Sequence, residues 1–557
     1  MNKVKRIVVT VLAVAAIGLS VHLWLFPSQA RTAAAVSKPN IIVILADDLG
    51  YGDTSVYGSK TVRTPNIDAL AASGVRFTDG YVTHPVCAPS RAGLLTGRYQ
   101  ERFGYEFNGS DRKGGVSLNE IMLPKVMKEA GYATGMVGKW HQGPNGQYYP
   151  TERGFDFFWG MSGGGTNYIT DPKPGDEFAG VGSDDEINDD PGAKPKKKPG
   201  KTLDAGAKLK GKPGKTTIAE LSPASADLET LRKQLEAVRT RAPITHNGFL
   251  AHETEYLTDA ITREALNFID QNRNHSFFLY VAHHAPHTPL QVTQKYYDRY
   301  PDIADKNTRI HAAMVSALDD GVGAIMGKLK ATGLDKNTIV FFLSDNGCPG
   351  YLRGACSNYP LVGFKRTHFE GGVRIPFIIS WPGHAPAGQV DHRTVSSLDI
   401  FPTAVAAARG KLPSDRPYDG IDLMPYLTGK RSGAPNPVLY WRAGPTFAIR
   451  DHDWKMIVMN IAPPGAKAGN GIKFKTARAD DSSSLPPYPA TFGQRAMLYN
   501  LKNNPAETYN LADLQQPVVL RLKAMLADWN KTLVPPQRPS KTQSYEEYDG
   551  VLLHLYD

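Results

Sequence analysis

Short hydrophobic runs without polar interruptions recur along the chain, separated by amphipathic stretches. The run NIIVILA (Asn40–Ala46) is rich in isoleucine and valine and too short for a stable helix, so it predicts a strand buried on both faces. Four further runs have the same character: ATGMVG, FFLYVA, TIVFFLS and PFIISW. Buried strands alternating with amphipathic stretches are typical of an α/β domain with a mostly parallel sheet between helices.

The C-terminal part of the chain has a different pattern. PVLYWRAGPTFAIRDHDWKMIVM (437–459) predicts strands joined by a turn at residues 451–453. VVLRLKAMLADWNKTL (518–533) has leucine, methionine and tryptophan at helical spacing and predicts an amphipathic helix. The tail that follows, residues 536–557, has no clear assignment.

The N-terminus predicts export. Three basic residues within the first six positions precede an apolar run over residues 7–26, and small residues follow. Residues 1–36 therefore predict a signal peptide or, since the run is about long enough to cross a bilayer, an uncleaved membrane anchor. Either alternative places the body of the protein in the periplasm or outside the cell.

A charged, glycine- and proline-rich segment spans residues 171–245. It contains nine lysines within residues 194–215 and no apolar periodicity, so it predicts a surface loop, with a short amphipathic helix over 225–241. An alternative function for the lysines is to bind an anionic polymer or a membrane surface. These lysines and four basic N-terminal residues account for the net charge of +10, so the pI does not indicate nucleic-acid binding.

Residues with metal-binding or catalytic chemistry follow four of the predicted strands. In chain order they are Asp47 and Asp48, Lys139 and His141, the histidines His283, His284 and His287, and Asp345 and Asn346. Each group alone is also compatible with a turn or a structural histidine. In an open parallel sheet, however, ligands bind beyond the carboxyl ends of the strands, so the recurrence predicts one composite site. Three carboxylates and an amide oxygen suit Ca²⁺ or Mg²⁺ better than zinc.

The three cysteines fall into two groups. Cys348 and Cys356 lie in one Gly/Pro-containing loop and can form a disulfide in an exported protein, which leaves Cys87 as an odd thiol. Pro89 suits the first turn of a helix and Gly97 fits just beyond its end. Cys87 is then expected at a helix N-terminus, which favours anions; the alternative is a small buried cysteine before a helix.

The stretch CAPSRAGLLTGR resembles the signature of the type I sulfatases, cysteine-x-Pro-Ser-Arg followed by a Leu-Thr-Gly element. Other blocks resemble the family in the usual order: PNIIVILADDLGYGD, GYATGMVGKWHQG, APHTPL, FFLSDNG, KRTHFEGGVRIPFIISWPG and LYNLKNNPAETYNLA. The resemblance runs from about residue 37 to 532, and the lysine-rich insertion is the main departure. Within the family the blocks look most similar to arylsulfatases and N-acetylgalactosamine-6-sulfatases.

This resemblance implies a chemistry for Cys87. A maturation enzyme would oxidise Cys87 to Cα-formylglycine, whose hydrated form carries the hydroxyl that attacks the sulfur of a sulfate ester. The family's metal, normally Ca²⁺ and less often Mg²⁺, would be bound by Asp47, Asp48, Asp345 and Asn346 together with the formylglycine at position 87.

The resemblance also implies roles for the remaining site residues. Arg91 would hold the hydrated aldehyde and the metal ligands, and Lys139 and Lys365 would bind sulfate oxygens. His141 would support the hydrate and take its proton, and His287 would bind the substrate and act as the general acid at the leaving oxygen. Roles for His283 and His284 are open, and His368 has a structural role as the simpler explanation.

The family resemblance further implies the architecture. Residues 37–410 would form a large α/β domain of the alkaline-phosphatase superfamily, and residues 411–535 a smaller domain with an antiparallel sheet and a helix. The segment SGGGTNYITDP (162–172) would border the cleft.

The expected function is hydrolysis of sulfate esters of a polysaccharide, an oligosaccharide or an aryl alcohol. The alternatives are a phosphoester or phosphonate hydrolase of the same superfamily and a non-catalytic glycan-binding relative. The second alternative predicts losses among Cys87, Asp345, Asn346 and Lys365, all of which are present.

Overall fold

The five buried hydrophobic runs are strands of one eleven-stranded sheet in the computed structural model. The structure describes residues 38–108, 114–170, 173, 175–178, 242–352, 354–462, 472–473, 494–537, 540, 542–548 and 551–556. In spatial order the strands of the sheet are β12 (Gln389–Asp391), β2 (Val75–Tyr81), β11 (Arg374–Ser380), β10 (Thr338–Ser344), β1 (Asn40–Ala46), β8 (Phe277–Ala282), β3 (Ala133–Lys139), β4 (Phe157–Met161), β6 (Ile244–His246) and β7 (Phe249–Leu250), with β13 (Val395–Ser396) beside β2.

The centre of this sheet is parallel, as predicted. Strands β10, β1, β8, β3 and β4 all run in one direction, whereas β11, β6 and β7 are antiparallel to their neighbours. The carboxyl ends of β1, β3, β8 and β10 therefore meet at one edge of the sheet, which brings together the residues that follow them.

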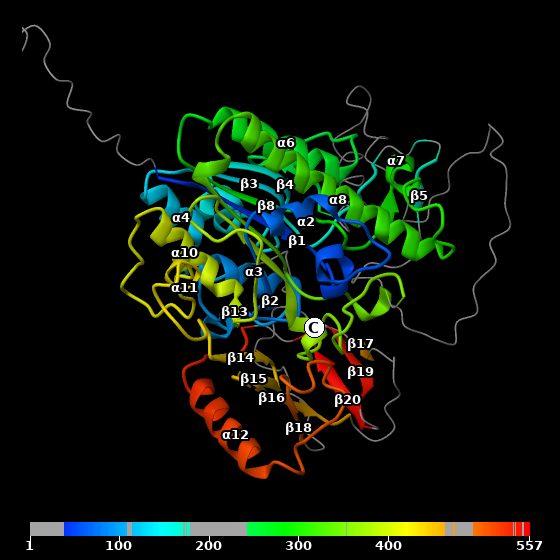
Figure 1. The fold of residues 1–557 in the computed structure, drawn as a ribbon, viewed down its shortest axis with the longest axis vertical. Helices are drawn as coiled ribbons and strands as arrows, with labels where there is room; N and C mark the ends of the chain where they lie inside the picture. Colours follow the sequence, from blue (N-terminus) through cyan, green and yellow to red (C-terminus); the bar gives the residue numbers. More distant parts are fainter. Residues whose placement is uncertain are drawn as a thin grey trace, which may run out of the picture. The chain divides into compact units, whose positions relative to one another are not determined.

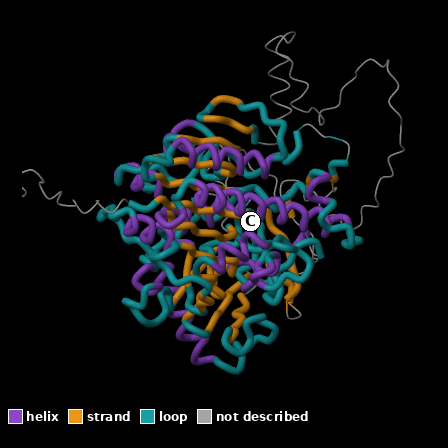
Figure 2. Tube along the Cα trace, turned by 45° about the horizontal axis from the view of Figure 1, so that its top comes forward, coloured by secondary structure: helices purple, strands orange, loops and turns teal. Residues whose placement is uncertain are grey.

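Helices cover both faces of the sheet, which explains why its central strands are hydrophobic throughout (Figures 1 and 2). In β1, Ile42 and Ile44 pack into one core with the helices α2 (Pro65–Ala72), α6 (Leu257–Gln271) and α8 (Lys306–Ala331). Ile41, Val43 and Leu45 point to the opposite face and pack with α3 (Cys87–Thr96), α4 (Leu123–Glu129) and α10 (Ile400–Ala407). This period of two residues is that of a strand between two layers.

A separate antiparallel sheet forms the C-terminal part. Its strands are β14 (Val438–Ala443), β15 (Thr446–Asp451), β16 (Trp454–Asn460) and β18 (Gln494–Asn500), and the predicted turn separates β15 from β16. The helix α12 (Gln516–Asn530) packs on this sheet through Leu522 and Trp529, so the amphipathic helix is also confirmed. The unassigned tail contains the antiparallel pair β19 (Thr542–Tyr548) and β20 (Val551–Tyr556), next to β17 (Ile472–Lys473).

A buried group of ion pairs connects the two sheets, and we call it the interface cluster. Its members are Asp79, Glu370, Glu507, Arg374, Arg450 and Lys455. Lys455 of β16 lies 2.7 Å from Glu370 of α9 (Glu370–Val373) and 3.2 Å from Glu507, and all three side chains are fully buried. Arg374 contacts both Glu370, at 3.2 Å, and Asp79, at 3.1 Å.

Two predicted segments fall largely outside the described residues. The N-terminal segment 1–36 and the helix over 225–241 are not among them. At the edges of the charged insertion, β5 (Glu177–Phe178) pairs with β9 (Gln291–Val292), and β6 begins at Ile244, one residue before the end of the predicted loop at residue 245. Residues Pro39–Asp557 form one compact unit, and the division at residue 410 stays a prediction. None of the helices in the described residues is long and apolar enough to cross a membrane.

Candidate active site

Two pairs of polar residues lie side by side at the carboxyl ends of β1 and β10. Ala46 pairs with Ser344 at the end of the parallel ladder, so the residues that follow the two strands are neighbours. The backbone N–H of Asp48 donates to Oδ1 of Asp345 at 3.2 Å, and Nδ2 of Asn346 donates to Oδ1 of Asp48 at 2.7 Å. All four are buried, so the structure brings these predicted site residues together at this edge.

Cys87 is the first residue of α3, and the helix ends at Gly97 with a φ of 64°. The buried Sγ atom lies 3.5 Å from Oδ1 of Asp47 and 3.9 Å from Oδ1 of Asp48. Burial, followed by the charge of Asp345, raises the pKa of the Cys87 thiol well above its ordinary value. Since the thiolate is the nucleophilic form, the unmodified side chain is a poor nucleophile in this setting.

Arg91 lies one helical turn after Cys87 and connects three strand ends. Its Nε donates to Oδ2 of Asp345 at 2.8 Å, and its Nη1 donates to the carbonyl of Lys139 at 2.9 Å. Lys139 in turn places Nζ 2.7 Å from Oδ2 of Asp47. Burial opposes ionisation of Asp47, but Lys139, His287 and Arg91 together hold the pKa of this carboxyl well below its usual range.

Lys365 and His287 lie in loops, outside the helices and strands, and reach the same carboxylates. Nζ of Lys365 lies 3.0 Å from Oδ2 of Asp48 and 3.4 Å from Nε2 of His287. Nδ1 of His287 is 2.6 Å from the carbonyl of Thr288, so Nδ1 carries the proton that it donates and Nε2 faces the site. Burial lowers the pKa of His287, but the charges of Asp47 and Asp48 outweigh burial and raise it.

The other histidines separate into two groups. His141, which follows β3, has a pKa well below its usual value because of burial and the charge of Lys139. His284 places Nδ1 3.1 Å from Oδ2 of Asp47, so it also belongs to the site. His283 and His368 are buried, and none of their ring nitrogens has a hydrogen-bond partner within the described residues. The structure thus brings His284 to the site and provides no contact for His283 or His368 there.

Sequence reasoning missed residues that support the histidine loop. The hydroxyl of Tyr168 donates to the carbonyls of His284, at 2.5 Å, and His287, at 2.8 Å, while its ring stacks on the imidazole of His284. A Cβ atom at Gly164 would lie only 2.8 Å from Nε2 of His141, so the loop can approach this ring closely because it carries glycine. The glycine run before Tyr168 indicates that the backbone packs closely against another part of the protein, but nothing in the sequence pattern identifies Tyr168 as a supporting residue.

The oxygen atoms at the strand ends fit a hard divalent cation. Ligand atoms of Asp47, Asp48, Cys87 and His287 lie within 4.8 Å of one another. Oδ1 of Asn346 is buried and has no hydrogen-bond donor among the described residues, which leaves this acceptor available as a ligand. Asp345 adds a third carboxylate, since its Oδ1 accepts from the N–H of Asp48 at 3.2 Å. Three carboxylates and one amide oxygen match the preference of Ca²⁺ or Mg²⁺ for oxygen ligands.

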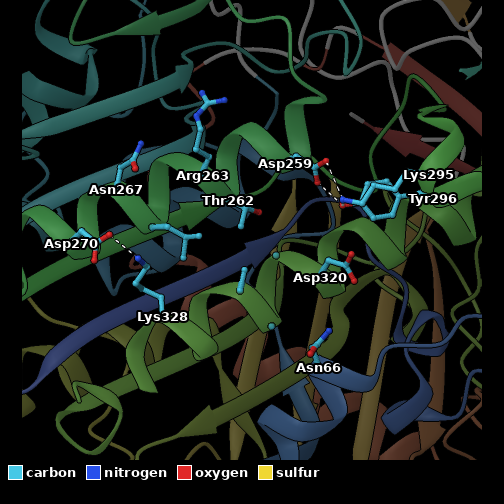
Figure 3. Close-up of a pocket in the computed structure, with 14 residues that line it drawn as sticks. Asn66, Asp259, Thr262, Arg263, Asn267, Asp270, Lys295, Tyr296, Asp320 and Lys328 are labelled. Atoms are coloured by element: carbon cyan, nitrogen blue, oxygen red, sulfur yellow. Dashed lines mark hydrogen bonds and ion pairs between the residues drawn. The ribbon is translucent and has the colours of Figure 1, made fainter. Parts of the chain in front are cut away.

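A groove of about 580 Å³ elsewhere on the chain has a different character (Figure 3). It lies between α6 and α8 and shares no lining residue with the strand-end site. Its charged side chains lie in ion pairs, as in Lys328 with Asp270 at 2.7 Å and Lys295 with Asp259 at 3.7 Å, and Arg263 and Asp320 pair with residues outside the groove. We therefore take the strand ends, and not this groove, as the candidate active site.

Comparison with known proteins agrees with the geometry. A family model described as Sulfatase matches residues 39–411. The chain is 32% identical to N-acetylgalactosamine-6-sulfatase of Mus musculus, covering 91% of this chain and 88% of the relative. It is 34% identical to arylsulfatase A of Bos taurus, covering 86% and 84%.

A similar crystal structure is that of Ps i-CgsB, which has also been solved in complex with k-i-k-neocarrahexaose. Its TM-score is 0.68 at 32% identity, covering 90% of this chain and 94% of that one.

Proposed function

Because this chain belongs to the sulfatase family and is a sulfuric ester hydrolase, we propose that it removes sulfate from a sulfated polysaccharide or oligosaccharide by means of a formylglycine made from Cys87. The observation that carries the proposal is the position of Cys87. Its side chain lies at a helix N-terminus, against the carboxylates of Asp47 and Asp48, where the unmodified thiol is held protonated.

The charges of the site support the binding of an anion. The carboxylates of Asp47, Asp48 and Asp345 are balanced by three cations, Arg91, Lys139 and Lys365. Asp47, Asp48, Asp345 and Asn346 would hold Ca²⁺, which makes the site net positive. Bound Ca²⁺ supplies a Lewis acid that polarises a sulfate oxygen, and hydrated formylglycine supplies the hydroxyl that attacks sulfur.

Lys139 and Lys365 bind the sulfate oxygens from two sides. Their ammonium groups contact Asp47 and Asp48 respectively, so each is held beside a metal ligand in a buried setting. Fixed positive charge in such a setting stabilises the negative charge that develops during transfer. Arg91 orients the residue at position 87, since both lie in the first turns of α3.

The two site histidines have the opposite pKa shifts that an acid and a base require. Asp47 and Asp48 raise the pKa of His287, and His287 would deliver a proton from Nε2 to the leaving oxygen. His141, with its lowered pKa, is neutral and accepts a proton from the hydroxyl at position 87. Environments that shift two titratable groups apart are a common feature of acid–base sites.

The carbohydrate part of the proposal is supported by the relatives. The mouse relative is named for a sulfated amino sugar, and Ps i-CgsB was solved with a neocarrahexaose. The segment from Gly164 to Tyr168 borders the histidines and supplies a surface for the sugar. We further propose that the protein is exported to the periplasm or beyond and depends on a maturation enzyme of its host.

The experiment compares substrates on one preparation in which the aldehyde at position 87 has been verified. 4-Nitrophenyl sulfate, 4-nitrophenyl phosphate and a panel of sulfated oligosaccharides are assayed for anion release, with Cys87→Ala as the control. We expect turnover of the aryl sulfate and of at least one sulfated sugar, and little turnover of the phosphate. Preference for the phosphate would favour the phosphoester hydrolase, and failure on every sugar would contradict the carbohydrate part.

A further inference from the structure

A second group of metal-binding side chains lies outside the candidate active site. The carboxylate of Asp53 and the sulfur atoms of Cys348 and Cys356 offer ligand atoms that all lie within 4.8 Å of one another. The two cysteines form a disulfide across eight residues of sequence. Asp53 and Cys348 are buried, and Cys356 is half-buried.

His311 of α8 adds a fourth side chain. It is fully buried, and neither ring nitrogen has a hydrogen-bond partner within the described part of the chain. Its Nε2 lies 3.9 Å from Oδ2 of Asp53, which is too long for a hydrogen bond. Two ligand atoms at zinc–ligand distances of about 2.0–2.1 Å in a tetrahedral site are about 3.4 Å apart, so His311 and Asp53 would have to approach each other to bind one ion. His311 lies outside the group of ligand atoms within 4.8 Å, so its ring would also have to move toward the sulfur atoms.

The carboxylate of Asp53 is already oriented by the backbone. Its Oδ1 accepts from the N–H of Ser357 at 2.8 Å and its Oδ2 accepts from the N–H of Gly50 at 2.9 Å. Hydrogen bonds of this kind commonly fix the ligands of metal sites.

We propose that reduction of the Cys348–Cys356 disulfide converts this group into a zinc site, with two thiolates, the Asp53 carboxylate and the His311 imidazole as ligands. A phosphine or dithiol reductant supplies two electrons, the S–S bond breaks, and two protons from solvent give two thiols. Zinc binding then releases both thiol protons and forms two Zn–S bonds. Two sulfurs, one nitrogen and one oxygen suit zinc, whereas the oxygen set of the candidate active site suits a harder ion.

The group lies in a loop that connects two parts of the candidate active site, so bound zinc would affect how those parts are held. The N–H of Gly52 donates to the carbonyl of Ser357 at 2.8 Å, and the N–H of Lys365 donates to the carbonyl of Cys348 at 3.0 Å. The disulfide loop therefore joins the segment that follows Asp48 to the segment that carries Lys365. In a chain whose disulfide is open, bound zinc would keep these two parts of the active site together.

Cobalt spectroscopy of the full-length Cys87→Ser variant tests the proposal, because Cys348 and Cys356 are then the two remaining cysteines. The protein is reduced with a phosphine, saturated with Ca²⁺ to fill the oxygen site, and titrated with Co²⁺. We expect one equivalent to give thiolate-to-cobalt charge transfer and tetrahedral d–d bands, which Zn²⁺ abolishes. The oxidised protein should give neither. Absence of thiolate bands in the reduced protein would overturn the proposal.

Two further variants control for folding and for other sites. Reduced protein is expected to melt at a higher temperature with Zn²⁺ than without it, and Cys348→Ser/Cys356→Ser should lose this increase. His311→Leu should weaken zinc binding by at least about tenfold, whereas the matched buried histidine variant His283→Leu should bind as tightly as the parent. An equal increase in the double serine variant would show that zinc binds elsewhere and would contradict the assignment. These readouts do not depend on sulfatase activity, so they stand apart from the test of the proposed function.

Discussion

Two charge clusters in this molecule hold equal numbers of carboxylates and cations in different arrangements. The active-site cluster holds three carboxylates and three cations, Asp47, Asp48, Asp345, Arg91, Lys139 and Lys365, and the interface cluster likewise holds Asp79, Glu370, Glu507, Arg374, Arg450 and Lys455. In both clusters every carboxylate lies within 3.2 Å of a cation, so pairing between opposite charges does not separate them.

In the active-site cluster several possible metal-ligand atoms lie close together. Oxygens of Asp47 and Asp48, the sulfur of Cys87 and a nitrogen of His287 gather within 4.8 Å, and Oδ1 of Asn346 is buried beside them with no donor in the described residues. Charge balance alone therefore does not identify a catalytic site. What distinguishes the active-site cluster is a group of possible metal-ligand atoms within 4.8 Å of one another.

The largest loss of stability is expected from Lys455→Met in the interface cluster. Removal of the ammonium leaves Glu370 and Glu507 buried without their shared cation, and breaking a buried pair in this way costs roughly 3–5 kcal/mol. Thermal denaturation should show a clear fall in melting temperature, while the protein that remains folded keeps near-normal kcat. A variant that melts normally but loses kcat would place Lys455 in catalysis.

The matched change in the active-site cluster is Lys365→Met. Loss of a fixed charge beside the sulfate should lower kcat/KM for an aryl sulfate by about 10²- to 10³-fold, with no comparable loss of stability. Steady-state kinetics and a melting curve on the same sample separate the two outcomes. If Lys365→Met instead lowered the melting temperature and kept near-normal kcat, as expected for Lys455→Met, the two clusters would not differ in function.

Asp399 lies outside both clusters and shows how a buried carboxyl without a cation partner makes stability depend on pH. Asp399 is buried, and its hydrogen-bond donors are the N–H groups of Ser396 and Ile421 and the amide of Asn436, none of them charged. Burial raises the pKa of Asp399 to about 7. A folded-state pKa above the unfolded value means that the folded protein binds more protons between about pH 4 and 7, so this group's contribution to stability is lost as pH rises through that range.

Replacing the carboxyl should remove this pH dependence. The difference in melting temperature between the parent and Asp399→Asn is expected to be larger at pH 5 than at pH 7.5, with thermal denaturation in matched buffers as the measurement. A difference that does not change with pH would mean that Asp399 is ionised in the folded protein.

The smallest change in melting temperature and kcat is expected when an exposed ion pair is removed. Lys531 lies 2.8 Å from Asp528, and about three quarters of each side chain is exposed to solvent. Because water screens this pair, Lys531→Met should leave both the melting temperature and kcat within experimental error. A fall in melting temperature as large as that of Lys455→Met would contradict the view that burial makes an ion pair important for stability.

Much of the active site could be predicted from the sequence because it depends on strand ends. The runs before Asp47, Lys139 and Asp345 are short and contain no charged residue, so the strands and their shared edge could be predicted from the pattern. Lys365 follows no strand, and only the family resemblance indicated it. It reaches the site through a loop held by the carbonyl of Cys348.

Other parts could not be predicted because they depend on contacts between distant residues. The pairing of Lys455 with Glu370 joins positions 85 residues apart, and the sequence around neither residue indicates its partner. Tyr168 positions the histidine loop through two backbone carbonyls, a contact that leaves no signature in sequence. The tail pairs as β19 and β20, although its first strand is largely polar and shows no hydrophobic run.

The chemical state of position 87 tests the central claim most directly. Active protein from the natural host can be digested and the peptide containing Cys87 analysed by mass spectrometry, together with the specific activity of the same sample. We predict a peptide lighter by the difference between a thiol and an aldehyde, in a fraction that rises in proportion to activity. An unmodified thiol throughout fully active protein would contradict the account.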